Sequence, residues 1–155
     1  MSASRITIRP ARRGDVPDIV AMLADDPLGR CRERLEDPLP LAYFAAFEAV
    51  EADSNIQLMV AEGDDGVVVG CLQLCILPGL SSQGARRGLI EDVRVATRWR
   101  GKRIGEAMVR WAIDEARARG CKLVELLTHQ TRVDAQRFYV RLGFQPSHVG
   151  MTLRF

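Results

Sequence analysis

The densest group of residues able to bind a ligand lies between positions 98 and 105. The stretch Arg100-Gly101-Lys102-Arg103-Ile104-Gly105 follows a β-type run and comes directly before a helical pattern. The first N–H groups of a helix lack partners, and glycine lets a backbone approach a ligand closely. With the cationic side chains, these groups favour a phosphate or pyrophosphate. The alternative interpretation is a solvated basic turn at the start of a surface helix.

Other common ligand motifs are missing from the sequence. It contains neither G-x-x-x-x-G-K-[ST] nor G-x-G-x-x-G, so a nucleoside triphosphatase or a dinucleotide oxidoreductase gains little support. The residues that zinc prefers lie at spacings unlike those of zinc sites: Cys31, Cys71, Cys75, Cys121, His129 and His148. We therefore expect no metal site, and cysteines that mostly pack in the core.

Length and charge limit the class of protein. The 155 residues carry a net charge of +2 and suit a single domain covering residues 1–155. So small a charge argues against a broad nucleic-acid-binding surface. The N-terminus lacks the apolar core of a signal peptide, and the most apolar run, 67–77, is shorter than the ~20 residues that cross a bilayer. These features predict a cytoplasmic protein with reduced thiols and with no membrane or nucleic-acid partner.

Apolar periodicity predicts the order β, α, α, β, β, β, α, β, α, β. The predicted strands cover residues 6–9, 57–61, 67–77, 89–95, 122–127 and 151–155. The first predicted helix is capped by Asp15, and the others cover 41–50, 105–119 and 134–142. Residues 25–40 and 78–88 are predicted to be mainly loops. The order indicates a mixed α/β fold with an antiparallel hairpin and a β-α-β crossover around the basic stretch.

Three segments resemble the GNAT superfamily of N-acetyltransferases: Ile90-Glu91-Asp92-Val93-Arg94-Val95, Arg100 to Gly105, and Asp134 to Phe144 with Phe138-Tyr139 and Gly143-Phe144. Their order and spacing match as well. The family's pyrophosphate loop reads R/Q-x-x-G-x-G/A; here Arg103 stands where its middle glycine is usual. A negative φ at that position would let a side chain be tolerated. The resemblance implies a mostly antiparallel sheet flanked by helices, with a central β-α-β cofactor-binding unit.

The resemblance also implies a cosubstrate, acetyl-CoA, and no metal. Its pyrophosphate is expected on residues 100–105, and its pantetheine arm along the backbone amides of Val93 and Val95, where the fourth and fifth strands part. Arg132 stands where many members carry an asparagine that contacts the cofactor. A cation at that position is a further cofactor-binding candidate.

The same resemblance makes Tyr139 the candidate general acid, which protonates the departing thiolate. A protonated amine must lose a proton before it attacks a carbonyl, so a base or a water path is also needed. Glu91 and Asp92 are adjacent on a predicted strand and therefore point to opposite faces unless a bulge intervenes. We favour Glu91 and keep Asp92 second; a solvated or ion-paired carboxylate is the alternative for either.

The activity implied is acetyl transfer to a primary amine of a small molecule by direct attack in a ternary complex. Two alternatives stay open: a catalytically silent acyl-CoA sensor or scaffold, and a protein N-acetyltransferase. The segment 25–50 mixes acidic and basic residues, so it does not identify the acceptor. The ending from Phe144 onward resembles members that act on small amines, including aminoalkylphosphonates. Many members dimerise, so a homodimer involving the terminal strand is a further expectation.

Overall fold

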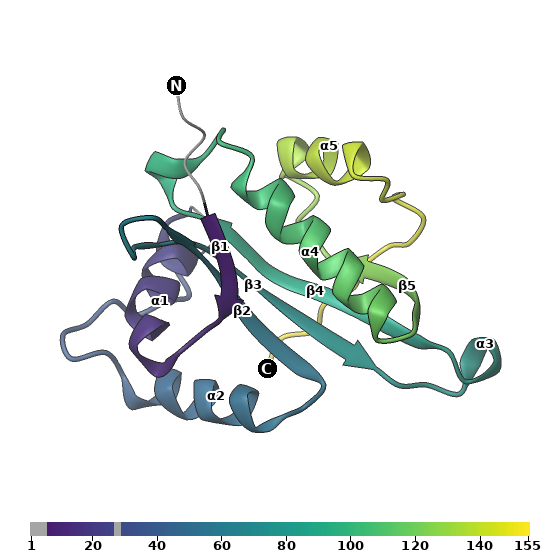
Figure 1. The fold of residues 1–155 in the computed structure, drawn as a ribbon, viewed down its shortest axis with the longest axis horizontal. Coiled ribbons are helices and arrows are strands. Elements are labelled where there is room, and N and C mark those ends of the chain that lie inside the picture. The colour runs from purple at the N-terminus through teal and green to yellow at the C-terminus, as the bar shows by residue number, and fades with distance from the viewer. Residues whose placement is uncertain (1–5, 27–28) are drawn as a thin grey trace.

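Five stretches rich in β-branched and aliphatic residues form one sheet in the order β1-β2-β3-β4-β5 (Figure 1). The computed structural model describes residues 6–26 and 29–155. Its strands are β1 (Ile6–Pro10), β2 (Ile56–Gly63), β3 (Val68–Leu77), β4 (Arg86–Val95) and β5 (Cys121–Leu126). Neighbouring strands pair antiparallel from β1 to β4, and β4 pairs parallel with β5. This confirms the mixed, mostly antiparallel sheet.

Helices cover both faces of the sheet. They are α1 (Val16–Ala24), α2 (Leu41–Ala52), the short α3 (Ser81–Gly84), α4 (Ile104–Ala118) and α5 (Val133–Arg141). On one face, α4 buries Met108, Ala112 and Ala116, whose spacing of four residues places them in one row. On the other face, α1 buries Ile19 and Met22. Because both faces are covered, β3 is buried along almost its whole length.

An ion pair connects β1 to the start of α1. Asp15 precedes α1 as predicted, but its carboxylate does not cap that helix: it accepts hydrogen bonds from the Arg9 guanidinium, at 2.7 Å, and from the Arg12 N–H, at 2.7 Å. Burial alone would raise the pKa of Asp15, yet these hydrogen bonds outweigh it and the pKa lies below its ordinary value. The Asp15 carboxylate therefore stays ionised and holds the connection between β1 and α1 in place.

The largest differences from the predicted elements are at the start of β4 and in the tail. β4 begins at Arg86 rather than Leu89, because Arg87 and Gly88 pair with both β3 and β5, and Arg86 pairs with β5. The predicted strand 151–155 is wrong: residues 144–155 form no strand, and the side chain of Met151 is 93% exposed. A strand needs a neighbour for its hydrogen bonds, and this tail has no strand beside it within the described part of the chain. Among the described helices, none is long and apolar enough to cross a membrane.

Candidate active site

A gap opens where β4 and β5 part. Their parallel pairing covers Arg86 to Ile90 on β4 and ends there, so the rest of β4 has an open edge toward β5. The N–H of Ala96 donates to the Val69 carbonyl of β3 at 2.9 Å. Since successive N–H groups of a strand point to opposite edges, those of Val95 and Val93 point into the gap. The two valines expected to present backbone amides thus have them on the open edge.

A β-bulge lies at this edge. Gln73 of β3 pairs with Glu91, whereas Cys71, two residues earlier, pairs with Arg94, so two residues of β4 oppose one of β3. Asp92 takes a left-handed backbone with φ of 51°. Without the bulge, residues three apart on a strand would point to opposite faces. The extra residue shifts this alternation by one, so Glu91 and Arg94 share one face of the sheet. Cys71 belongs to the cluster that packs against α1, so this is the α1 face.

The two acidic candidates have different surroundings. The Glu91 carboxylate accepts from Gln73 Nε2 at 3.4 Å and from the Cys75 thiol at 3.8 Å, on the α1 face. Asp92 is the bulge residue, exposed to solvent, and its backbone carbonyl accepts from the Cys71 thiol at 3.7 Å. The Glu91 carboxylate is therefore the one that side chains of β3 hold.

The basic loop leads into α4 with two left-handed residues, Gly101 at φ of 78° and Arg103 at φ of 62°. The negative φ considered for Arg103 is therefore wrong. This backbone favours glycine, which explains why an arginine is unusual there. Directly after it, the N–H groups of residues 104–106 begin α4, and a helix provides them with no acceptor. They form a row of donors at the positive end of the helix dipole.

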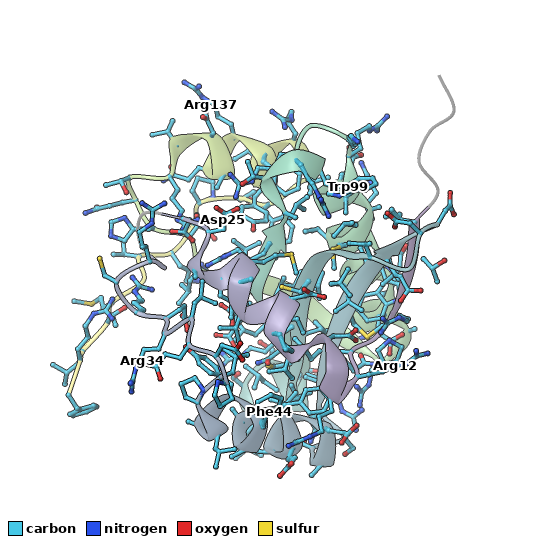
Figure 2. The ribbon with its side chains drawn as sticks, turned by 90° about the vertical axis from the view of Figure 1, so that its left-hand side faces the viewer. Arg12, Asp25, Arg34, Phe44, Trp99 and Arg137 are labelled. Carbon is cyan, nitrogen blue, oxygen red and sulfur yellow. The ribbon has the colours of Figure 1, made fainter. Side chains whose placement is uncertain are left out.

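The cationic side chains of the loop are already engaged. Arg100 donates from Nε to the Val95 carbonyl at 3.1 Å and lies 3.6 Å from the Asp25 carboxylate. The Lys102 ammonium stacks on the Trp99 ring at 4.2 Å, and Arg103 pairs with Glu106 at 3.0 Å. The groups left free to bind an anion in this loop are therefore mainly backbone N–H groups. Figure 2 shows Asp25 at the end of α1 that lies toward α5.

Tyr139 lies on α5 in an aromatic cluster. Its ring packs edge-on against Phe138 and Phe144, with centroids 5.0 and 5.8 Å away. Burial raises the pKa of Tyr139 above its ordinary value of 10, and the charges of Arg94 and Arg132 lower it by less. The phenol therefore keeps its proton at neutral pH and can donate it. A Cβ added to Gly105 would lie 3.5 Å from Val95 and 3.8 Å from Phe138, so α5, β4 and the start of α4 meet here.

One carboxylate joins two arginines beside Tyr139. Asp26 Oδ1 accepts from Arg132 Nη2 at 2.8 Å, and Asp26 Oδ2 lies 3.6 Å from Arg94 Nη2. Arg132, expected from sequence at a cofactor contact, is thus part of an ion-pair group. Asp26 and Arg94 were not predicted as site residues, because the three positions are far apart in the chain and no local pattern connects them.

The cysteines of this region are not activated nucleophiles. Burial raises the pKa of the Cys71 thiol to about 12 and raises that of Cys75 as well. A high pKa keeps a thiol protonated and unreactive. Within residues 6–26 and 29–155, no group of three acidic, cysteine or histidine side chains is arranged to hold a metal ion.

The comparisons with known proteins agree with this geometry. The acetyltransferase (GNAT) family model matches residues 19–144. The aminoalkylphosphonate N-acetyltransferase of Salmonella typhimurium is 36% identical over 111 residues, which cover 72% of this chain and 71% of that protein. The glucosamine 6-phosphate N-acetyltransferase 1 of rice, Oryza sativa subsp. japonica, is 37% identical over 114 residues, covering 74% of this chain and 67% of that one.

A solved structure is more similar still. A Bacillus halodurans C-125 protein described as a transcriptional regulator superposes with a TM-score of 0.94 and 47% identity, covering 97% of this chain and all of that one. The family model spans most of the chain, and the matched segment contains the open edge of β4, the loop before α4 and Tyr139. The chain therefore belongs to the GNAT family of acetyltransferases.

Proposed function

We propose that this protein transfers the acetyl group of acetyl-CoA to a primary amine of a small molecule by direct attack in a ternary complex. The observation that carries the proposal is the meeting of three elements: the open edge of β4, the free N–H groups of α4 and the protonated phenol of Tyr139. Each supplies something that acetyl transfer needs. The first two bind an extended, phosphate-bearing donor, and the third can protonate a leaving group.

The backbone fits the donor that this proposal requires. The N–H groups of Ile104 and Gly105 suit a pyrophosphate at the start of α4. The N–H groups of Val93 and Val95 suit the amide groups of a pantetheine arm. Bound acetyl-CoA supplies the acetyl group and, after transfer, a thiolate as leaving group. No side chain of a special type is needed along this path, which agrees with the engagement of Lys102 and Arg103 elsewhere.

Two side chains would move protons. Tyr139 donates its phenolic proton to the leaving sulfur and recovers one from water. Glu91, whose carboxylate is held by Gln73 on the α1 face, accepts a proton from the acceptor's ammonium group, directly or through water, and the neutral amine then attacks the acetyl carbonyl. Asp92 is the second candidate base, and bulk water the third.

The acceptor class is suggested by two relatives. Aminoalkylphosphonates and glucosamine 6-phosphate, named for the Salmonella and rice proteins, both carry a primary amine and a phosphorus oxyanion. We extend the small-amine acceptor to this chain on that basis. The net charge of +2 argues against a nucleic-acid partner. We further propose that the enzyme acts in the cytoplasm and has no membrane partner.

Release of the CoA thiol from acetyl-CoA, measured with a panel of amines and with product masses, tests the activity. We expect release that depends on the amine. A sensor or scaffold would bind CoA in calorimetry yet release no thiol with any amine. The description of the Bacillus halodurans protein as a transcriptional regulator is the reason to test for such a non-catalytic role. Release with lysine peptides but no small amine would favour a protein N-acetyltransferase instead.

We also propose a homodimer built on the tail. Val149, Met151, Leu153 and Phe155 alternate along the tail and are almost fully exposed. β5 is at the edge of the sheet, and an edge strand can accept another strand. A second copy that adds its tail to this edge would bury the four side chains. Light scattering should give a dimer mass, and replacing Met151 and Leu153 together by Ser should give a monomer mass.

A further inference from the structure

Two guanidinium groups share a single carboxylate beside Tyr139. Arg94 and Arg132 carry two positive charges, and Asp26 between them carries one negative charge. The Arg94 side chain is only 23% exposed and that of Arg132 32%. Cations taken out of water at low exposure are stabilised by anions close to them. The group as a whole therefore has an excess of one positive charge in a partly buried place.

Arg94 retains unused hydrogen-bonding capacity. Its Nη1 donates to the Val93 carbonyl at 2.9 Å and its Nη2 lies 3.6 Å from Asp26. Its Nε is buried and has no hydrogen-bond partner among the described residues. An unpaired donor on a charged group costs free energy unless a ligand accepts from it. A guanidinium with a free Nε–H suits an oxyanion with two acceptor oxygens.

This charge lies on the face of the sheet opposite α4, although Asp25, the neighbour of Asp26, also contacts Arg100 of the loop. The bulge directs Arg94 to the α1 face of the sheet, whereas α4, whose first turn carries the free N–H groups, packs on the opposite face. Both arginines are close enough to Tyr139 to influence its titration. In the proposed function Tyr139 serves the sulfur end of acetyl-CoA, and that end carries no phosphate. We therefore assign an anion at these arginines to the acceptor rather than to acetyl-CoA.

The same face holds an opposite charge at a defined spacing. Glu91 and Arg94 lie opposite Gln73 and Cys71, two residues apart on β3. Two residues along a strand span about 7 Å. A molecule that places a cation at Glu91 and an oxyanion at Arg94 would have a chain of two or three carbons between its charged groups.

We propose that Arg94, assisted by Arg132, binds the anionic group of the acceptor, and that the acceptor is a short zwitterionic amine carrying a phosphonate, phosphate or carboxylate. The inference rests on the proposed function and adds the residues that select the acceptor. Glu91 meets the amine and Arg94 meets the oxyanion. Asp26 holds the two guanidiniums in place before the acceptor arrives.

The test compares three amines with equal chains: 3-aminopropylphosphonate, 4-aminobutyrate and the neutral-tailed propylamine. With acetyl-CoA, we expect the wild-type kcat/KM to be at least 10-fold higher for one of the two acids than for propylamine. Arg94→Gln should reduce this ratio to about 1. Arg132→Gln should reduce it less, since Arg132 is more exposed. Arg117→Gln, which removes another carboxylate-paired arginine from the surface of α4, is the matched control and should keep the wild-type ratio.

Propylphosphonate has the anionic group but no amine, so it can bind without being acetylated. Its inhibition constant therefore measures binding of the anionic group alone. Propylphosphonate should compete with the amine in the wild type and lose affinity at least 10-fold in Arg94→Gln. Equal loss of kcat for all three amines would assign Arg94 to the chemistry and overturn the proposal, as would a change confined to the Kd of CoA. A wild type that prefers propylamine would overturn it too. Absence of turnover with every amine would contradict the proposed function itself, whereas the Kd of propylphosphonate from calorimetry would still report on Arg94.

Discussion

The two ends of the candidate site are built in different ways. The proposed donor end, from Val93 to Gly105, is one continuous segment, and the groups that we propose for binding are mainly backbone N–H groups. The acceptor end brings together side chains from α1's end, β4 and the start of α5: Asp26, Arg94 and Arg132. The first depends on backbone geometry and tolerates changes of side chain. In our proposal, the second depends on the specific charges of these three side chains.

Tyr139 lies between the two ends, and its replacement should have the largest effect. Tyr139→Phe keeps the ring contacts with Phe138 and Phe144 but removes the phenolic proton. We expect kcat to fall by about 10²-fold or more, the scale of a lost general acid, with the Kd of CoA unchanged. Stopped-flow or steady-state kinetics with one accepted amine measures kcat, and calorimetry measures the Kd of CoA.

The pH profile gives an independent check on the same residue. A general acid works only while protonated, so activity should persist through neutral pH and fall only as the pH rises past the pKa of Tyr139, which burial holds above 10. Tyr139→Phe should lose this alkaline limb. An unchanged kcat in the variant would remove Tyr139 from the mechanism and leave water as the proton donor.

Replacement of Glu91 should have the next largest effect. Glu91→Gln keeps the size of the side chain and its place beside Gln73, but removes the base. We expect kcat/KM to fall by about 30-fold and the acidic limb of its pH profile to flatten, within the usual range for a lost general base. Asp92→Asn is the matched control, because Asp92 is the adjacent carboxylate and Gln73 donates to Glu91. A collapse in Asp92→Asn with a normal Glu91→Gln would reverse the assignment.

A third change tests the donor end alone. A Cβ at Gly105 meets Val95 and Phe138 at ordinary contact distances, so Ala fits, whereas Val adds two further methyl groups to a space that is already in contact. Gly105→Val should weaken CoA binding about 10-fold in calorimetry by pushing the β4 edge and α5 apart. Gly105→Ala should bind like the wild type. Equal affinities in all three proteins would move the phosphate site away from this helix.

The contrast between the two ends also explains what the sequence could predict. The order of strands and helices up to α5, apart from the short α3, follows from local periodicity, and the proposal for the donor end follows from a continuous motif. The bulge at Asp92 depends on pairing with β3, a strand some 20 residues away, so alternation alone could not show that Glu91 and Arg94 share a face. Asp26 and Arg132 are 106 positions apart and meet only in the fold. The tail 151–155 has the period of a strand but lacks a partner within the described monomer.

The smallest effect concerns the residue that departs from the family's loop. Arg103 adopts a left-handed backbone, which costs a residue with a Cβ about 1 kcal/mol relative to glycine. Arg103→Ala and Arg103→Gly both remove the side chain and its ion pair with Glu106, so their difference isolates the backbone. We expect the glycine variant to be more stable to urea than the alanine variant by about 1 kcal/mol, reduced somewhat by the greater freedom of unfolded glycine. If backbone N–H groups bind CoA at the donor end, both variants should bind CoA with a Kd within about 2-fold of the wild-type value. A 10-fold loss in both would mean that the guanidinium itself binds the donor, and the contrast between the two ends would then fail at this residue.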